Sequence, residues 1–140
     1  MATLAVDTPR VYELGDIGEH PVIAADIIYE GAAVGLEAAS GNARPLVAGD
    51  KFLGFAEQNV DNSLGSAGEK RVRVIERGKI EVPIAGLAAT NVGDPVYASD
   101  DNTFTLSDGA GANSFIGRVA RFVEAGVGVV AFDATRVVAA

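Results

Sequence analysis

The segment from Arg71 to Ile84 constrains the fold more than any other part of the chain. Its apolar residues fall on even positions and its charged residues on odd ones: Val72, Val74, Ile80, Val82 and Ile84 against Arg71, Arg73, Arg77, Lys79 and Glu81. A period of two is typical of a β-strand that has one face in a core and the other in water. We therefore predict a strand whose even face is buried.

Gly78 divides this segment, and two interpretations have to be compared. A two-residue hairpin loop at Arg77-Gly78 would place Val74 opposite Glu81 and mix the two faces. A three-residue loop over residues 77–79 would keep the faces apart, but its glycine would normally stand last. We therefore favour one long strand that bends at Gly78.

Composition favours an all-β fold. The 140 residues include 17 glycines, and the valines are scattered rather than grouped at helical spacing, as in chains of short strands joined by tight turns. We predict a small β-barrel or sandwich, formed by a single domain over residues 21–140. Residues 1–20 show neither period, and Pro9, Gly15 and Gly18 interrupt any helix, which predicts an extended N-terminal arm.

The chain also repeats a short pattern. Gly31-Ala-Ala-Val34 precedes Gly93-Asp-Pro-Val96 by 62 residues, and the segment 51–56 precedes the similar segment 114–119 by 63. A valine-rich stretch follows in each case, at residues 71–75 and at residues 126–132. We interpret the domain as two related halves.

Several functional classes are disfavoured by composition. The absence of cysteine excludes disulfides, thiolate metal sites and thiol nucleophiles. A net charge of −8 argues against nucleic-acid binding, which depends on phosphate contacts. No window approaches the roughly 18 apolar residues of a membrane helix, and the N-terminus lacks a signal-peptide layout. We expect no membrane partner.

Catalytic and ligand-binding motifs are equally scarce. His20 is the single histidine, no Gly-x-Ser-x-Gly motif occurs, and the Gly-x-Gly pairs lack the rest of a phosphate-binding fingerprint. Four loop carboxylates could hold a hard cation, although such residues more often cap turns: Asp94, Asp100, Asp101 and Asp108. We predict no enzyme, no cofactor and no metal site.

Five of the eleven basic residues lie between Lys70 and Lys79. We call four of them the basic strip: Arg71, Arg73, Arg77 and Lys79. On an acidic protein such a strip could meet an acidic partner or a sister subunit, and the alternative is an ordinary solvated strand face.

Six short motifs occur in an order and spacing that together indicate a family: Thr8-Pro9-Arg10, Pro21-Val22-Ile23-Ala24-Ala25, Ile28-Tyr29-Glu30-Gly31-Ala32, Val60-Asp61-Asn62-Ser63, Arg77-Gly78 and Val92-Gly93-Asp94-Pro95-Val96-Tyr97. With this order the chain resembles the capsid cement (head decoration) proteins of tailed bacteriophages, especially those in Mu-like structural gene clusters. The resemblance implies a β-rich, non-catalytic protein on the outer surface of the virion capsid. It also implies that the major capsid protein is the partner and that the chain forms homotrimers.

The arm carries the residues that we predict to contact the capsid or a sister subunit: Pro9, Arg10, Val11, Tyr12, Leu14 and Ile17. Its apolar members are unusual for a pure linker, which suggests ordering against another chain. The chain departs from the family at residues 83–86 and at its final residues 136–140. The alternative function is a β-barrel binding module of a phage tail or surface, for example one that recognises carbohydrate.

Overall fold

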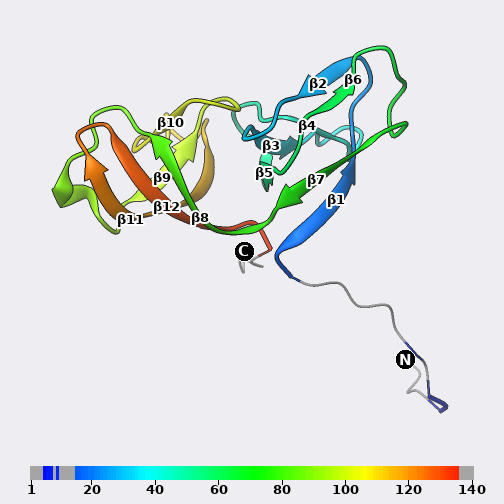
Figure 1. The fold of residues 1–140 in the computed structure, drawn as a ribbon, viewed down its shortest axis with the longest axis horizontal. Coiled ribbons are helices and arrows are strands. Elements are labelled where there is room, and N and C mark those ends of the chain that lie inside the picture. The colour runs from blue at the N-terminus through cyan, green and yellow to red at the C-terminus, as the bar shows by residue number, and fades with distance from the viewer. Residues whose placement is uncertain (1–4, 8, 10–14, 136–140) are drawn as a thin grey trace.

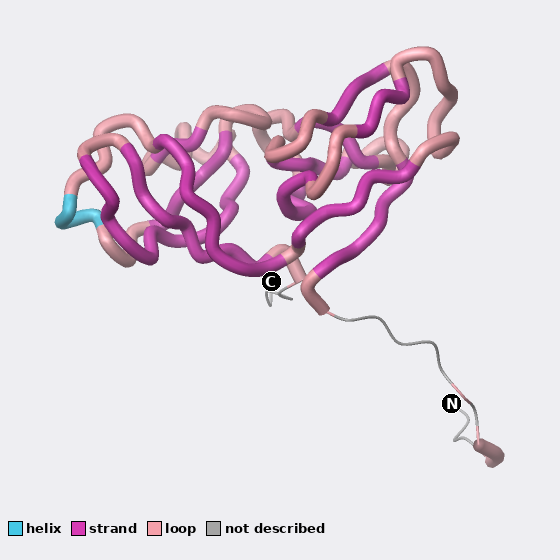
Figure 2. Tube along the Cα trace, viewed as in Figure 1, coloured by secondary structure: helices cyan, strands magenta, loops and turns pink. Residues whose placement is uncertain are grey.

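The structure, a computed structural model, describes residues 5–7, 9 and 15–135 (Figure 1). Strands dominate this part of the chain, and its one helical element is a short 3-10 turn, η1 (Ala89–Asn91) (Figure 2). The strands are β1 (Ile17–Pro21), β2 (Asp26–Ile28), β3 (Ala33–Leu36), β4 (Ala43–Pro45), β5 (Lys51–Ala56), β6 (Val60–Asn62), β7 (Arg71–Ile75), β8 (Arg77–Pro83), β9 (Pro95–Ala98), β10 (Phe104–Thr105), β11 (Ser114–Glu124) and β12 (Val127–Asp133). The predicted all-β class is confirmed. Among the described residues, no helix is long and apolar enough to cross a membrane.

The strands form two five-stranded antiparallel sheets, each curled into its own lobe (Figure 1). One sheet has the order β1-β7-β5-β3-β4, and the other has the order β8-β12-β11-β9-β10. A separate two-stranded sheet, β2 with β6, lies at the far end of the first lobe (Figure 1). Each lobe therefore has a complete sheet of its own.

The two large sheets share one topology. When the five strands of each sheet are numbered along the chain, both sheets have the spatial order first, fifth, fourth, second, third. Equivalent hydrogen bonds recur: Gly31 N donates to Ala56 O (2.9 Å), and Gly93 N donates to Val119 O (2.8 Å). We call residues 17–76 the first half and residues 77–133 the second half. The predicted internal repeat is confirmed at the level of strand pairing.

A glycine marks the same position in both halves. Gly54 on β5 and Gly117 on β11 are the glycines that the repeat aligns. A Cβ atom on Gly54 would overlap the carbonyl oxygen of Ile75 on β7, and one on Gly117 would overlap that of Ala131 on β12. Each half therefore depends on the same close approach between its fourth and fifth strands.

The segment 71–84 is two strands, so the prediction of one long strand was wrong in this respect. The break lies at Glu76, whose N–H donates to Asp16 O (2.8 Å) and whose carbonyl accepts from Ala134 N (2.7 Å). β7 belongs to the first sheet and β8 to the second, so the chain passes between lobes without a hairpin.

The predicted faces of this segment are confirmed on both sides of the break. Val72, Val74, Val82 and Ile84 are buried, and Ile80 is half-buried against the core of the second half. The charged odd positions are exposed along both strands. The alternation therefore continues across the break because both strands turn their even face inward.

The boundary of the N-terminal arm also needs correction. Strand β1 pairs with β7 in a register that places Ile17 opposite Ile75 and Pro21 opposite Arg71. Residues 17–20 therefore belong to the first sheet and not to the predicted arm. Gly18 leaves room for the side chain of Glu76, because a Cβ atom there would overlap the carboxylate in its present position. That contact joins residues 58 positions apart, so local sequence could not reveal it.

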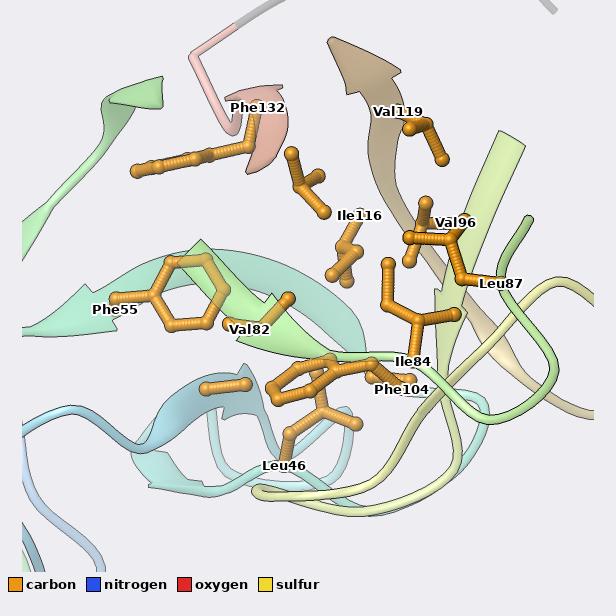
Figure 3. Close-up of a cluster of buried hydrophobic side chains, with 13 residues drawn as sticks. Leu46, Phe55, Val82, Ile84, Leu87, Val96, Phe104, Ile116, Val119 and Phe132 are labelled. Carbon is orange, nitrogen blue, oxygen red and sulfur yellow. The ribbon is translucent and has the colours of Figure 1, made fainter. Parts of the chain in front are cut away.

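Two buried clusters hold the body together. The first contains only first-half residues: Val22, Ile28, Ala32, Val34, Ala43, Ala56, Val60, Val72 and Val74. The second fills the other half but also includes Ala33, Leu46 and Phe55 from the first (Figure 3). At this junction the ring centroids of Phe55 and Phe132 lie 4.9 Å apart, and those of Phe52 and Phe132 lie 6.1 Å apart. The halves are therefore joined by an aromatic contact.

Candidate functional site

The basic strip follows the outer face of β7 and β8 and thus crosses from one lobe to the other. Two of its members have acidic partners within the chain. Arg73 Nε lies 3.5 Å from Glu57 Oε2, and Arg77 Nε donates to Asp16 Oδ1 at 2.7 Å. The bond to Asp16 raises the pKa of Arg77 above its ordinary value. The positive charge of the strip is therefore partly offset by Glu57 and Asp16.

The predicted arm residues are only partly described by the structure. Pro9 is exposed. Ile17 is also described, whereas the remaining candidates lie outside the described residues: Arg10, Val11, Tyr12 and Leu14. The structure thus places two of the six candidate contact residues.

Ile17 contributes to a small exposed apolar patch. It lies opposite Ile75 in the β1–β7 pair, and each of the two side chains is 38% exposed. Neighbouring aliphatic side chains on a sheet surface bury area against each other, yet this pair still leaves apolar surface open to water. Ile17 lies two residues after Gly15, where the continuously described part of the chain begins, and the patch is a candidate contact surface.

A second exposed surface lies on β9 and β11 and was not predicted. Phe115 is 50% exposed and pairs across the strands with Tyr97, with ring centroids 5.8 Å apart in an edge-to-face arrangement. Arg118 Cζ lies 5.9 Å from the centroid of the Phe115 ring, within the range of a cation–π contact. We call Tyr97, Phe115 and Arg118 the open aromatic face. The two rings are 18 residues apart in sequence, so only the strand register brings them together.

The loop carboxylates act on their own turns. Asp94 accepts from Asn91 Nδ2 (3.0 Å), and Asp108 accepts from Ala110 N (3.1 Å). A hydrogen bond from the N–H of Asn102 lowers the pKa of Asp100, whereas burial and then the neighbouring Asp100 charge raise that of Asp101. Within the described part of the chain, no three His, Asp or Glu side chains gather as a metal site.

His20 contacts an acidic residue of its own half. Its Nε2 lies 3.9 Å from Glu76 Oε1, and the two side chains are 28% and 20% exposed. A catalytic base needs a nucleophile or a substrate atom within hydrogen-bond reach. The described contacts of His20 instead place it on β1, the edge strand of the first sheet, opposite Val72 on β7.

Comparisons with known proteins add no family assignment. A scan against protein-family models found no match, and a search of curated proteins found none either. Any functional interpretation therefore depends on the motifs in the sequence and on the surfaces described above.

Proposed function

We propose that this chain is a capsid decoration protein that binds the outer surface of a phage head and stabilises the shell. The observation that carries the proposal is the exposed Ile17–Ile75 patch at the root of the N-terminal arm. Ile17 and Ile75 lie opposite each other, so their exposed parts form one small apolar surface that another protein could cover. Exposed apolar surface of this kind is typical of interaction sites when it is contiguous.

The motifs behind the resemblance support the proposal because they build the fold. Asn62 is buried, and its Nδ2 donates to Ile23 O (3.0 Å) and Ser66 O (3.1 Å), which fixes the loop after β6. Gly93 has a φ of 93°, a conformation that favours glycine, at the turn into β9. Asn62 and Gly93 thus have structural roles in this chain, and both belong to the motifs on which the resemblance rests.

The proposed function needs only binding and no chemistry. The partner is the major capsid protein, and the site of action is the outer face of the virion. A homotrimer, which the family resemblance implies, would combine several weak contacts and raise avidity by orders of magnitude. A protein that binds the assembled shell and not the dissociated subunits stabilises the shell by mass action.

A carbohydrate-binding module is the second candidate, and the open aromatic face is the observation that favours it. Sugars stack on exposed aromatic rings, and Phe115 is half exposed. Arg118, however, already lies over the Phe115 ring, and Tyr97 approaches it edge to face. Because Arg118 and Tyr97 already contact the Phe115 ring, capsid decoration remains the better-supported proposal.

Deleting residues 2–14 should separate binding from folding. The deletion stops before Asp16, which binds Arg77, and before β1, so the melting temperature should stay within a few degrees of that of the full chain. Binding to undecorated capsids should fall by at least about tenfold, since each lost arm contact is multiplied by the avidity of the assembly. Bound copies are counted after sedimentation.

A full-length variant carrying both Ile17→Ser and Ile75→Ser is the matched test of the exposed patch. It should also bind fewer copies per capsid while keeping its fold. Equal occupancy by the full chain, the truncated chain and the double variant would show that neither the arm nor the patch forms the interface.

A further inference from the structure

The repeat allows the two halves to be compared face by face, and one face differs sharply between them. Phe55 on β5 and Arg118 on β11 directly follow the two glycines that the repeat aligns, Gly54 and Gly117, and they pair with Ile75 and Ala131 respectively. The two residues are therefore structural equivalents.

Phe52 and Phe115 form a second equivalent pair. Each lies two residues before the same glycine, and each pairs with the second strand of its sheet, opposite Gly35 and Tyr97 respectively. The open aromatic face of the second half thus corresponds to the face of the first half that carries Phe52 and Phe55.

In the first half this face is covered by the second half. Phe55 is 2% exposed and contacts the rings of Phe132 and Phe104, with centroids at 4.9 Å and 6.0 Å (Figure 3). In the second half the equivalent face has no such cover among the described residues, and Phe115 is 50% exposed. A face that is buried in one repeat and exposed in the other is a candidate for cover by another molecule.

The residue that would cover the open face follows from the same comparison. Phe132 comes directly after Ala131 on β12, and Glu76 comes directly after Ile75 at the end of β7. Glu76 is therefore the first-half equivalent of Phe132. His20, whose side chain neighbours Glu76, corresponds to Val82. Ile75 pairs with Ile17 and Ala131 pairs with Lys79, and His20 and Val82 each lie three residues after that partner.

The side chains at these positions are complementary. Within the chain, an apolar residue meets an apolar residue at Phe55 and Phe132. The equivalent of Phe55 is the basic residue Arg118, and the equivalent of Phe132 is the acidic residue Glu76. Both side chains are at least partly exposed. Opposite charges at an interface fix register and favour one docking mode.

We propose that the open aromatic face binds a second copy of this chain, through the surface of its first half that carries the neighbouring side chains of Glu76 and His20. Arg118 of one copy pairs with Glu76 of the next, and Phe115 and Tyr97 supply the apolar centre of the contact. The contact repeats, between chains, the packing that joins the two halves within a chain. It is heterologous, and such a contact forms a ring if its rotation closes. The inference rests on the repeat and does not depend on capsid binding.

Charge reversal tests this contact in the full chain without capsids. The molar mass in solution, measured by light scattering during size-exclusion chromatography, should be a multiple of the 14.3 kDa chain mass. Arg118→Glu and Glu76→Arg should each weaken assembly by at least about tenfold, because like charges would then face each other. The double variant, in which the charges are exchanged, should regain most of the assembly.

Two further variants keep the test decisive if Glu76→Arg fails to fold. Phe115→Ser removes an exposed ring and should reduce assembly with an unchanged melting temperature. Arg121→Glu makes the same charge change at another exposed position of β11 and should leave the mass unchanged. A monomeric parent chain, or a mass that Arg118→Glu and Phe115→Ser do not alter, would overturn the proposal.

Discussion

Replacing Val82 with aspartate is expected to unfold the protein. Val82 is 6% exposed on the inward face of β8, within the cluster that fills the second half. A carboxylate there would lose its hydration without gaining a partner, at a cost of about 4 kcal/mol or more. That cost is comparable with the entire stability of a small domain, about 5–15 kcal/mol. Urea denaturation followed by circular dichroism measures the effect.

Lys79→Asp is the matched control for this substitution. Lys79 lies on the same strand, three residues earlier and on the exposed face, so its replacement should change the free energy of unfolding by less than about 1 kcal/mol. If Val82→Asp melted like the parent protein, the assignment of the even face to the core would be wrong.

The second large effect is expected at the equivalent glycines. Gly54→Ala and Gly117→Ala should each destabilise the protein by about 3 kcal/mol, because the added Cβ atom would overlap the backbone carbonyl of Ile75 or Ala131. A backbone oxygen in a paired strand cannot move aside as a flexible side chain can. Denaturant unfolding of both variants gives the two free-energy changes for comparison.

Gly111→Ala separates this steric effect from backbone strain. Gly111 has a φ of 87° with open space around its missing Cβ, so the cost there should be only the conformational one, about 1 kcal/mol. If Gly117→Ala were no more harmful than Gly111→Ala, the close approach of β11 to β12 would not be the reason for the glycine.

Local periodicity and the repeated motifs were enough to predict much of the fold. The alternation over residues 71–84 identified the buried faces of β7 and β8, because side chains on a strand point alternately to its two sides. The repeat of Gly31 and Gly93 predicted two related halves, since both glycines make the same turn and the same hydrogen bond to the neighbouring strand.

The remaining parts of the fold depend on contacts that are distant in sequence. Strand β1 is too short and polar to show a period, and it forms because its partner β7 offers a free edge more than 50 residues later. The break at Glu76 likewise comes from hydrogen bonds to Asp16 and Ala134, one from each end of the described body. No local pattern contains that information.

The candidate surfaces also combine features that the sequence shows with features that only the fold reveals. The basic strip was visible in the sequence, but its pairing with Glu57 and Asp16 was not, because those acids lie outside the strand. Tyr97 and Phe115 looked like ordinary strand residues. Their meeting on one exposed face requires the β9–β11 register, which pairs Phe115 directly with Tyr97.

The claim that the chain is a cement protein is tested most directly by the stability of the shell itself. Undecorated capsids are heated with and without the full chain at about one hundred times its dissociation constant, and the temperature of shell disruption is measured. Binding that is selective for the assembled state should add about 2.7 kcal/mol per occupied site and raise that temperature. Shells that are disrupted at the same temperature with the chain present would contradict the proposed function.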